Sequence, residues 1–173
     1  MTIKYTATRI TLRLKKFNRE DFSAYYQLVG DERVMAMITE RALSQEEAEA
    51  DFEKLLFSNR QHANFGSFMV FDAVSDAFMG LGKLEITIDN PEEVELGYIL
   101  LPEFWGKGIG TILAQQLMVK LEGHPELKYV FAIIDPKNEA SRKILINQGF
   151  VSREFKDFDG LPGEILVYTP PTS

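Results

Sequence analysis

Cysteine is absent from the sequence. This absence excludes disulfide bonds, thiolate metal ligands and a cysteine nucleophile, and it is compatible with a reducing compartment. Long apolar runs are missing as well, since no stretch approaches the roughly 20 residues that a membrane-spanning helix needs. The first residues also lack the apolar segment of a signal peptide. We therefore expect a soluble, cytoplasmic protein that does not associate with a membrane.

Basic residues are outnumbered by acidic ones. The chain has 19 Lys and Arg against 26 Asp and Glu, which gives a formal net charge of -7. A protein that neutralises nucleic-acid phosphates needs a basic surface, so direct nucleic-acid binding is not expected. Histidine is scarce too, and neither His62 nor His124 has a second histidine or a carboxylate at ligand spacing. No metal site is therefore expected.

The residues that are present suffice for one globular domain. Hydrophobic residues make up 45% of the 173 positions, which is enough for a core in a chain of this length. No internal repeat, low-complexity segment or interdomain linker interrupts the sequence. We expect a single domain over residues 1–173, with its core at about residues 9–169 and a loose tail at residues 170–173.

The first third of the chain has the pattern of a strand followed by two helices. Polar and apolar residues alternate over residues 9–14, which is typical of a half-buried strand. Asn18 is a suitable N-cap for a first helix, and Gly30 is a suitable terminator. The segment SQEE predicts a second helix, because Ser44 and Glu47 have the spacing of a capping box.

The middle of the chain changes to strand character. Residues 67–74 and 78–88 are rich in Phe, Val and Ile, and the turn residues between them predict a hairpin. Residues 94–101 form a further apolar strand that leads into the stretch FWGKGIGT, residues 104–111. Apolar residues then recur at helical spacing, so a helix is expected to begin at or just before Ile109.

The last third predicts a strand, a helix and a hairpin. Residues 129–134, YVFAII, are continuously apolar, which favours a strand at the centre of a sheet that is covered on both faces. The segment NEASRKILINQGF reads as a helix that ends at Gly149. The dipeptide Asp159-Gly160 predicts the turn of a closing hairpin.

Three glycines, Gly106, Gly108 and Gly110, thus occupy a turn between a strand and a helix. The first amides of a helix lack intrahelical partners, so such a turn is a potential anion site. Its spacing fits neither the phosphate loop of nucleotide hydrolases nor the GxGxxG pattern of dinucleotide-binding proteins. The alternative is a tight turn whose glycines only permit close packing of the helix.

Two segments resemble the GNAT superfamily of N-acetyltransferases. WGKGIG, residues 105–110, aligns with that family's pyrophosphate-binding signature Arg/Gln-x-x-Gly-x-Gly/Ala, and NEASRKILINQGF, residues 138–150, is similar to its Asn-x-x-Ala/Ser helix ending in Gly-Phe. Trp105 stands where the family usually has Arg or Gln, and together with ELGYILLPEFWGKGIGT it resembles the branch that contains the ribosomal-protein alanine and serine N-acetyltransferases.

The resemblance implies a fold and a reaction. The fold would be an α/β domain with a mixed, mostly antiparallel sheet of six or seven strands, about four helices, and a splayed pair of parallel strands at the cofactor. The reaction would be transfer of an acetyl group from acetyl-CoA to a primary amine, on a protein N-terminus or a small molecule, by direct attack of the neutral amine. A homodimer is suggested by the same resemblance. The alternative from another class is a noncatalytic acyl-CoA-binding sensor or interaction module.

The resemblance also implies a cofactor site. The backbone of residues 107–111 would hold the pyrophosphate, the pantetheine arm would run beside residues 98–100, and Asn138 would reach the arm from the far side unless it only caps its helix. Trp105 is expected either as a lid or, preferably, as a core anchor. The cofactor-binding residues expected on this basis are Tyr98, Ile99, Leu100, Trp105, Gly106, Lys107, Gly108, Ile109, Gly110, Thr111, Asn138 and Ser141.

Two residues are candidates for catalysis. Glu95 begins the strand that leads to the cofactor, on the same strand face as Gly97, and is the candidate base; the alternative is an ordinary surface glutamate. Many relatives carry a tyrosine in the second motif as the acid for the departing thiolate, but this chain has Leu145 there. Ser141 is the remaining candidate for the thiolate. The alternative is that its hydroxyl bonds only the local backbone and that solvent protonates the thiolate.

The acceptor is expected to bind between the first helices and the last hairpin, residues 18–60 and 155–168. Acidic residues in these segments are suited to attract a cationic amine, although they also fit the acidity of the whole chain. Four aromatic residues there are candidates for an apolar wall, and the alternative is that they belong to the core: Tyr25, Tyr26, Phe57 and Phe158.

Overall fold

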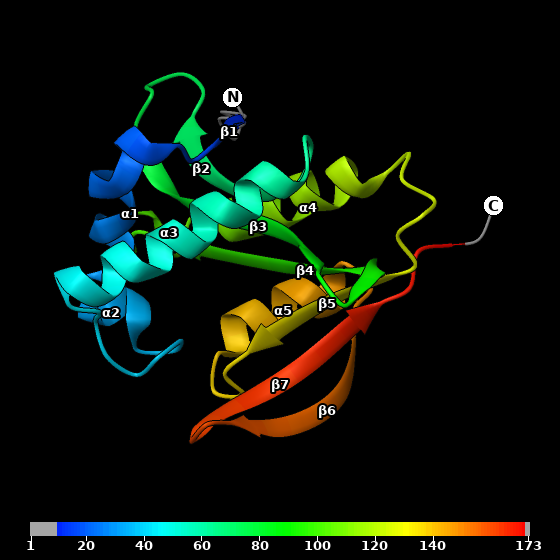
Figure 1. The fold of residues 1–173 in the computed structure, drawn as a ribbon. Helices are drawn as coiled ribbons and strands as arrows, with labels where there is room; N and C mark the ends of the chain where they lie inside the picture. The colour runs from blue at the N-terminus through cyan, green and yellow to red at the C-terminus, as the bar shows by residue number, and fades with distance from the viewer. Residues whose placement is uncertain (1–9, 172–173) are drawn as a thin grey trace, which may run out of the picture.

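The computed structural model describes residues 10–171, which form one seven-stranded sheet. The strands are β1 Leu12–Lys16, β2 Gly66–Asp72, β3 Phe78–Thr87, β4 Asn90–Leu100, β5 Tyr129–Ile134, β6 Val151–Phe158 and β7 Leu161–Tyr168. They lie in the order β1-β2-β3-β4-β5-β7-β6 (Figure 1). All neighbours are antiparallel except β4 and β5, so the sheet is mixed and mostly antiparallel, as the sequence predicted.

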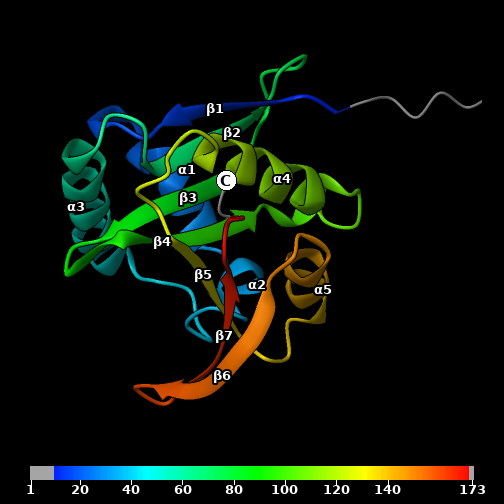
Figure 2. The same ribbon diagram turned by 90° about the vertical axis from the view of Figure 1, so that its right-hand side faces the viewer.

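Helices cover the sheet from both sides. They are α1 Phe22–Val29, α2 Glu32–Met35, α3 Gln45–Gln61, α4 Ile109–Leu121 and α5 Glu139–Asn147. Figure 2 shows α3 on one side of the sheet and α4 and α5 on the other. Two apolar clusters result, one beneath α1 and α3 and one beneath α4 and α5. Among residues 10–171, no helix combines the length and the apolar character needed to cross a membrane.

Local sequence signals account for several of these elements. The capping box of α3 is formed, with Glu47 N donating to Ser44 Oγ at 3.2 Å and Ser44 N donating to a Glu47 carboxylate oxygen at 3.1 Å. Gly30 ends α1, and α4 begins at Ile109 as predicted. The strand predicted from Arg9 is observed from Leu12, while Arg9 itself lies outside the described residues.

Three expectations about the elements need correction. β4 begins at Asn90 rather than at residue 94, because Asn90 already pairs with Thr87 across an irregular hairpin. The short helix α2 was not predicted at all. β5 is not covered on both faces, since Tyr129 and Ile133 are 42% and 39% exposed. A continuous apolar run does not report which of its faces a helix covers, and α5 covers only one.

The parallel pairing of β4 and β5 is short. It consists of three residue pairs and ends where Glu95 lies opposite Phe131. Beyond that point the two strands are no longer paired, so their later residues face a space that no neighbouring strand fills. This is the splayed parallel pair that the family resemblance implied.

Candidate active site

A cleft of about 680 Å³ opens where β4 and β5 part. Its walls come from the end of β4, the glycine turn, the end of β5, α5 and the segment around α2. The predicted cofactor residues all line it except Lys107, whose side chain is exposed outside the cleft. The structure therefore brings together residues that are about 40 positions apart in the sequence, such as Tyr98 and Ser141.

The glycine turn serves two purposes. Gly106 and Gly108 have φ values of 71° and 77°, and a Cβ added at either would meet no atom within 4 Å. Left-handed backbone favours glycine, and the empty surroundings show that these two positions are open rather than packed. Gly110 differs, because a Cβ there would lie 3.2 Å from Ile144 Cδ1. This third glycine lets α4 pack closely against α5.

The N-terminus of α4 carries no cap of its own. Gly108 is the N-cap residue and has no side chain to accept from the first amides. These N–H groups have no intrahelical acceptor, and they lie at the positive end of the helix dipole. The amides of residues 109–111 border the cleft, and this arrangement suits a phosphate or pyrophosphate group.

Trp105 is not a core anchor, contrary to the preferred expectation. It is 49% exposed, and its indole N–H donates to the Leu100 carbonyl at 2.9 Å. The indole therefore closes the rim of the cleft where β4 leads into the glycine turn. The Leu100 carbonyl thus already accepts a hydrogen bond within the protein, although Leu100 belongs to the segment predicted to bind the pantetheine arm.

The N-terminus of α5 faces the cleft with a complete cap. Asn138 Oδ1 accepts from Ser141 N at 3.1 Å, so the capping role of Asn138 is present, and its amide nitrogen is left as a donor. Arg142 then fixes α5 to β7, because its Nε lies 3.1 and 3.0 Å from the two carboxylate oxygens of the buried Glu164. Both contacts restrict where Ser141 lies.

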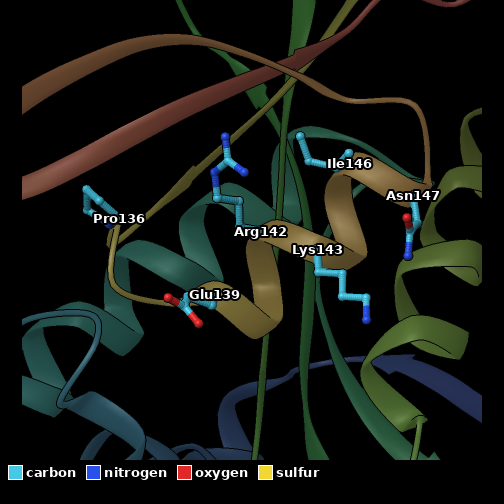
Figure 3. Close-up of a pocket in the computed structure, with 6 residues that line it drawn as sticks. All are labelled: Pro136, Glu139, Arg142, Lys143, Ile146 and Asn147. Carbon is cyan, nitrogen blue, oxygen red and sulfur yellow. The ribbon is translucent and has the colours of Figure 1, made fainter.

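A second, smaller hollow of about 450 Å³ follows α5. Figure 3 shows that Arg142 and Lys143 leave the helix in different directions there. Lys143 and Asn147 also line the main cleft. A positive charge therefore stands at the α5 side of the cleft, as Lys107 does beside the glycine turn.

Glu95 lies at the apex of the splayed strands. Its two carboxylate oxygens are 3.1 and 3.0 Å from Lys83 Nζ, and both side chains are mostly shielded from solvent. The carbon stem of Lys83 lies across Gly97, with its Cε 3.4 Å from the position that a Cβ on Gly97 would take. Gly97 lines the cleft and Glu95 does not, so the carboxylate stands just beyond the cleft wall.

The aromatic residues predicted as an acceptor wall lie outside the cleft. None of the four predicted aromatic residues lines the cleft: Tyr25 is in the core, Tyr26 stacks on Phe22, Phe57 is 53% exposed, and Phe158 packs over Gly163. The apolar wall on that side comes instead from the end of α2 and the turn after it, including Met37 and Ile38, each 41% exposed. This short segment carries no periodic pattern that would have identified it.

The sequence predicted Tyr98 as a cofactor-binding residue but indicated no role for its side chain. Strand alternation places it with Leu96 and Leu100 on the face that α4 and α5 cover. Its hydroxyl oxygen is buried and has no hydrogen-bond partner of good geometry among residues 10–171. Burial raises the pKa of the Tyr98 phenol, and the neighbouring Ser141 hydroxyl acts in the opposite direction. An unpaired buried hydroxyl beside a cleft marks a polar group that is unsatisfied in the free protein.

Solved structures with the same fold are acetyltransferases. A spermidine N-acetyltransferase from Vibrio cholerae, in complex with CoA and spermine, superposes with a TM-score of 0.74 at 22% identity, covering 91% of this chain and 95% of that one. A ribosomal L7/L12 α-N-protein acetyltransferase with coenzyme A gives 0.74 at 18% identity, with 92% and 94% covered. An aminoglycoside acetyltransferase with coenzyme A gives 0.76 at 14% identity, with 92% and 95% covered. At these identities the likeness establishes the fold.

The family itself is established by sequence. Residues 11–151 match the family model described as the acetyltransferase (GNAT) domain. This match spans β1 to the first residue of β6 and includes both segments that border the cleft. The resemblance read from WGKGIG and NEASRKILINQGF is thereby confirmed. The chain belongs to the GNAT acetyltransferase family, and it is an enzyme of that family rather than a binding module without activity.

Proposed function

We propose that this chain transfers an acetyl group from acetyl-CoA to a primary amine within a ternary complex. The observation that carries this proposal is the uncapped N-terminus of α4 at the mouth of a cleft that splayed parallel strands open. The turn places backbone N–H groups where a pyrophosphate needs donors, and the two open glycines leave room for it. Coenzyme A in several structures of the same fold supports this choice of cosubstrate.

Different residues would bind the different parts of acetyl-CoA. The amides of residues 107–111 would bind the pyrophosphate, with the exposed Lys107 side chain as an added positive charge. The unpaired edge of β4 at residues 98–100 would bind the pantetheine arm, and the amide nitrogen of Asn138 would donate to it from α5. When bound, acetyl-CoA supplies the thioester carbonyl that the amine attacks. No covalent enzyme intermediate is required, which agrees with the absence of cysteine.

Glu95 is the proposed general base. The carboxylate lies at the apex of the splayed strands, two residues before the cleft-lining Gly97, and the ion pair with Lys83 holds it in place. From this position it would take a proton from the ammonium form of the acceptor through one water molecule, which leaves the neutral amine to attack. Ser141 lines the opposite wall and is proposed to face the departing sulfur.

The acceptor is proposed to be a primary amine on a protein N-terminus or on a small molecule. Structures of the same fold act on spermidine, aminoglycosides and a ribosomal protein, which share only that nucleophile. The net charge of -7 favours approach of a cationic acceptor. The apolar segment around Met37 and Ile38 would contact the part of the acceptor next to the amine. The cytoplasmic location and the homodimer stay predictions.

Thermal unfolding with acetyl-CoA tests the function most directly. A ligand that binds only the folded state raises the unfolding midpoint by mass action. We expect millimolar acetyl-CoA to raise the midpoint, while ATP and NAD leave it unchanged. Release of CoA is then measured across a panel of amines: protein N-terminal peptides, polyamines, aminoglycosides and amino acids. No shift with acetyl-CoA, or a shift without turnover on any amine, would contradict the proposal.

Glu95→Gln tests the base. The variant should lower kcat mainly at pH values below the pKa of the acceptor amine, where deprotonation limits the rate, and it should leave CoA affinity unchanged. Lys83→Met is the matched control, because it breaks the same ion pair and keeps the carboxylate. Equal pH profiles of kcat for the wild type and Glu95→Gln would show that Glu95 is an ordinary structural glutamate and not the base.

A further inference from the structure

Tyr98 carries a hydroxyl that the protein alone does not satisfy. The phenol oxygen is buried without a hydrogen-bond partner of good geometry among the described residues. Its ring lies at the N-terminus of α4, with Cε2 3.9 Å from the position that a Cβ on Gly110 would take. Buried donors nearly always find a partner in folded proteins, and leaving one unpaired destabilises the fold. A partner is therefore expected to complete this group in a functional state.

Ser141 is the neighbour that can complete it. Its backbone N–H is fixed by Asn138 Oδ1, and its side chain lines the cleft at the start of α5. Ser141 lines the same cleft as Tyr98, and its hydroxyl lowers the pKa of the Tyr98 phenol against the larger effect of burial, which raises it. A serine hydroxyl has one donor and two acceptor sites. It can thus accept from Tyr98 while it donates into the cleft.

We propose that Tyr98 is a positioning residue for the leaving group. When coenzyme A is bound, the Tyr98 hydroxyl donates to Ser141 Oγ, and this bond turns the Ser141 O–H towards the sulfur. The inference rests on the proposed function, and it assigns to the side chain of Tyr98 a role distinct from the backbone contacts of β4. The α5 residue Leu145 is buried among apolar neighbours and offers no hydroxyl for this purpose.

The hydroxyl pair stabilises charge without giving up a proton. The amine nitrogen forms a bond to the carbonyl carbon, the C–S bond breaks, and its electron pair stays on sulfur. The nitrogen loses its surplus proton to the base and then to solvent, and solvent later protonates the thiolate. An ordinary thiol has a pKa of about 8.5, and the pKa of the Tyr98 phenol is raised above its usual 10.0. Proton transfer from the phenol to the thiolate is therefore unfavourable, whereas hydrogen bonds that strengthen as charge develops are favourable.

A double-mutant cycle with Tyr98→Phe and Ser141→Ala tests whether Tyr98 acts on the thiolate through Ser141. The readout is the pKa of the thiol of enzyme-bound CoA, followed by the ultraviolet absorbance of the thiolate during a pH titration. Each single variant should raise that pKa by about one unit or more, because a hydrogen bond to the thiolate is weakened or lost. The double variant should show no further rise beyond Ser141→Ala, because Tyr98 acts only through Ser141. Additive shifts would overturn the proposal.

Stability of the free protein distinguishes positioning from packing. Tyr98→Phe removes a buried donor without a partner, so the unfolding midpoint without ligand should stay equal or rise. A lower midpoint would show that the hydroxyl is already well bonded in the free protein, which overturns the proposal. Tyr168→Phe is the matched control, since Tyr168 packs against Gly149 and Phe150 outside the cleft lining. It should leave the pKa of the bound thiol unchanged.

The two proposals fail in different ways. If the wild type binds no CoA in the thermal experiment, both the function and the role of Tyr98 are overturned. If the wild type binds CoA and Tyr98→Phe leaves the pKa of the bound thiol unchanged, only the positioning role is overturned. Tyr98→Phe supports the hydroxyl pair if it raises the pKa of the bound thiol but leaves the CoA-induced rise of the unfolding midpoint at neutral pH unchanged. In that case only the thiolate form of CoA has lost a contact.

Discussion

Two helix N-termini border the cleft, and they are built in opposite ways. At α5, Asn138 Oδ1 accepts from Ser141 N, so a side chain of the protein satisfies one of the first amides of the helix. At α4, the N-cap is Gly108, which has no side chain to do this. The free amides of a helix N-terminus need acceptors, and those of α4 are therefore available to water or to a bound anion. The difference agrees with the proposal that α4 binds the pyrophosphate and that α5 forms a wall of the cleft.

The N-termini of α2 and α3 follow the pattern of α5. Asp31 accepts from two amides of α2, and Ser44 with Glu47 closes the capping box of α3. α1 has no side-chain cap at Asp21, and it continues directly from a short 3₁₀ turn that Asn18 caps. The N-terminus of α4, by contrast, has no side-chain cap, and it follows two glycines with left-handed backbone, Gly106 and Gly108. The exception therefore coincides with the position where the cleft opens.

Filling the glycine turn should have the largest effect. Gly108→Asn places a side chain over the open amides, while asparagine tolerates left-handed backbone better than most residues. We expect CoA affinity to fall at least about tenfold, because the new side chain caps α4 and occupies the phosphate position. Isothermal titration with CoA measures the change.

Gly123→Asn is the control for backbone strain. Gly123 has a φ of 81°, close to the 77° of Gly108, and a Cβ there would also meet no atom within 4 Å. It lies beyond the other end of α4, away from the cleft lining. Equal CoA affinities in the two variants would show that the bare N-terminus of α4 does not hold the cosubstrate.

Removing the cap of α5 should have a smaller effect. Asn138→Ala leaves the first amides of α5 without an acceptor and should lower the free energy of unfolding by about 1 kcal/mol. Asn138→Ser keeps a capping oxygen but removes the amide nitrogen. If Asn138 also donates to the pantetheine arm, Asn138→Ser weakens CoA binding and retains stability. Denaturant unfolding and CoA titration of both variants measure the two roles separately. Wild-type CoA affinity in both would limit Asn138 to capping.

Local signals in the sequence predicted most of the fold. Ser44 and Glu47 located α3, and the apolar spacing after Gly108 located the start of α4, because caps and periodicity act within a few residues. The exposed face of β5 was not predictable, because it depends on where a distant helix packs. The extent of β4 was missed for a similar reason, since Asn90 is held in it by pairing with β3.

Some residues of the site could be predicted from the sequence and others could not, because only some of them depend on local signals. The glycine turn could be found because its residues are adjacent and their backbone conformation is demanded locally. Tyr98 and Ser141 come together only through the packing of β4 against α5, so their hydroxyls could not be paired from sequence. The orientation of Trp105 depends on one hydrogen bond to Leu100, and nothing in its neighbours distinguishes a rim residue from a buried one.

The capping box of α3 should give the smallest effect, seen as acid sensitivity. Two hydrogen bonds from the Arg41 guanidinium, and then one from the backbone N–H of Ser44, lower the pKa of Glu47 to about 2. Because the folded pKa lies below the ordinary 4.5, the contribution of Glu47 to stability is present above that value and is lost as the pH falls towards 2. The carboxylate is solvent-exposed, so salt weakens the effect.

Glu47→Gln tests this contribution against the neighbouring acid. The unfolding midpoint of Glu47→Gln should lie below that of the wild type at neutral pH, and the gap should close on acidification, because protonated Glu47 no longer pairs with Arg41. Glu46→Gln is the control, since Glu46 lies in the same first turn and makes no ion pair among residues 10–171. A constant gap across the titration would show that Glu47 stabilises α3 through its capping geometry alone. The N-terminus of α3 would then match that of α5, where a neutral cap suffices.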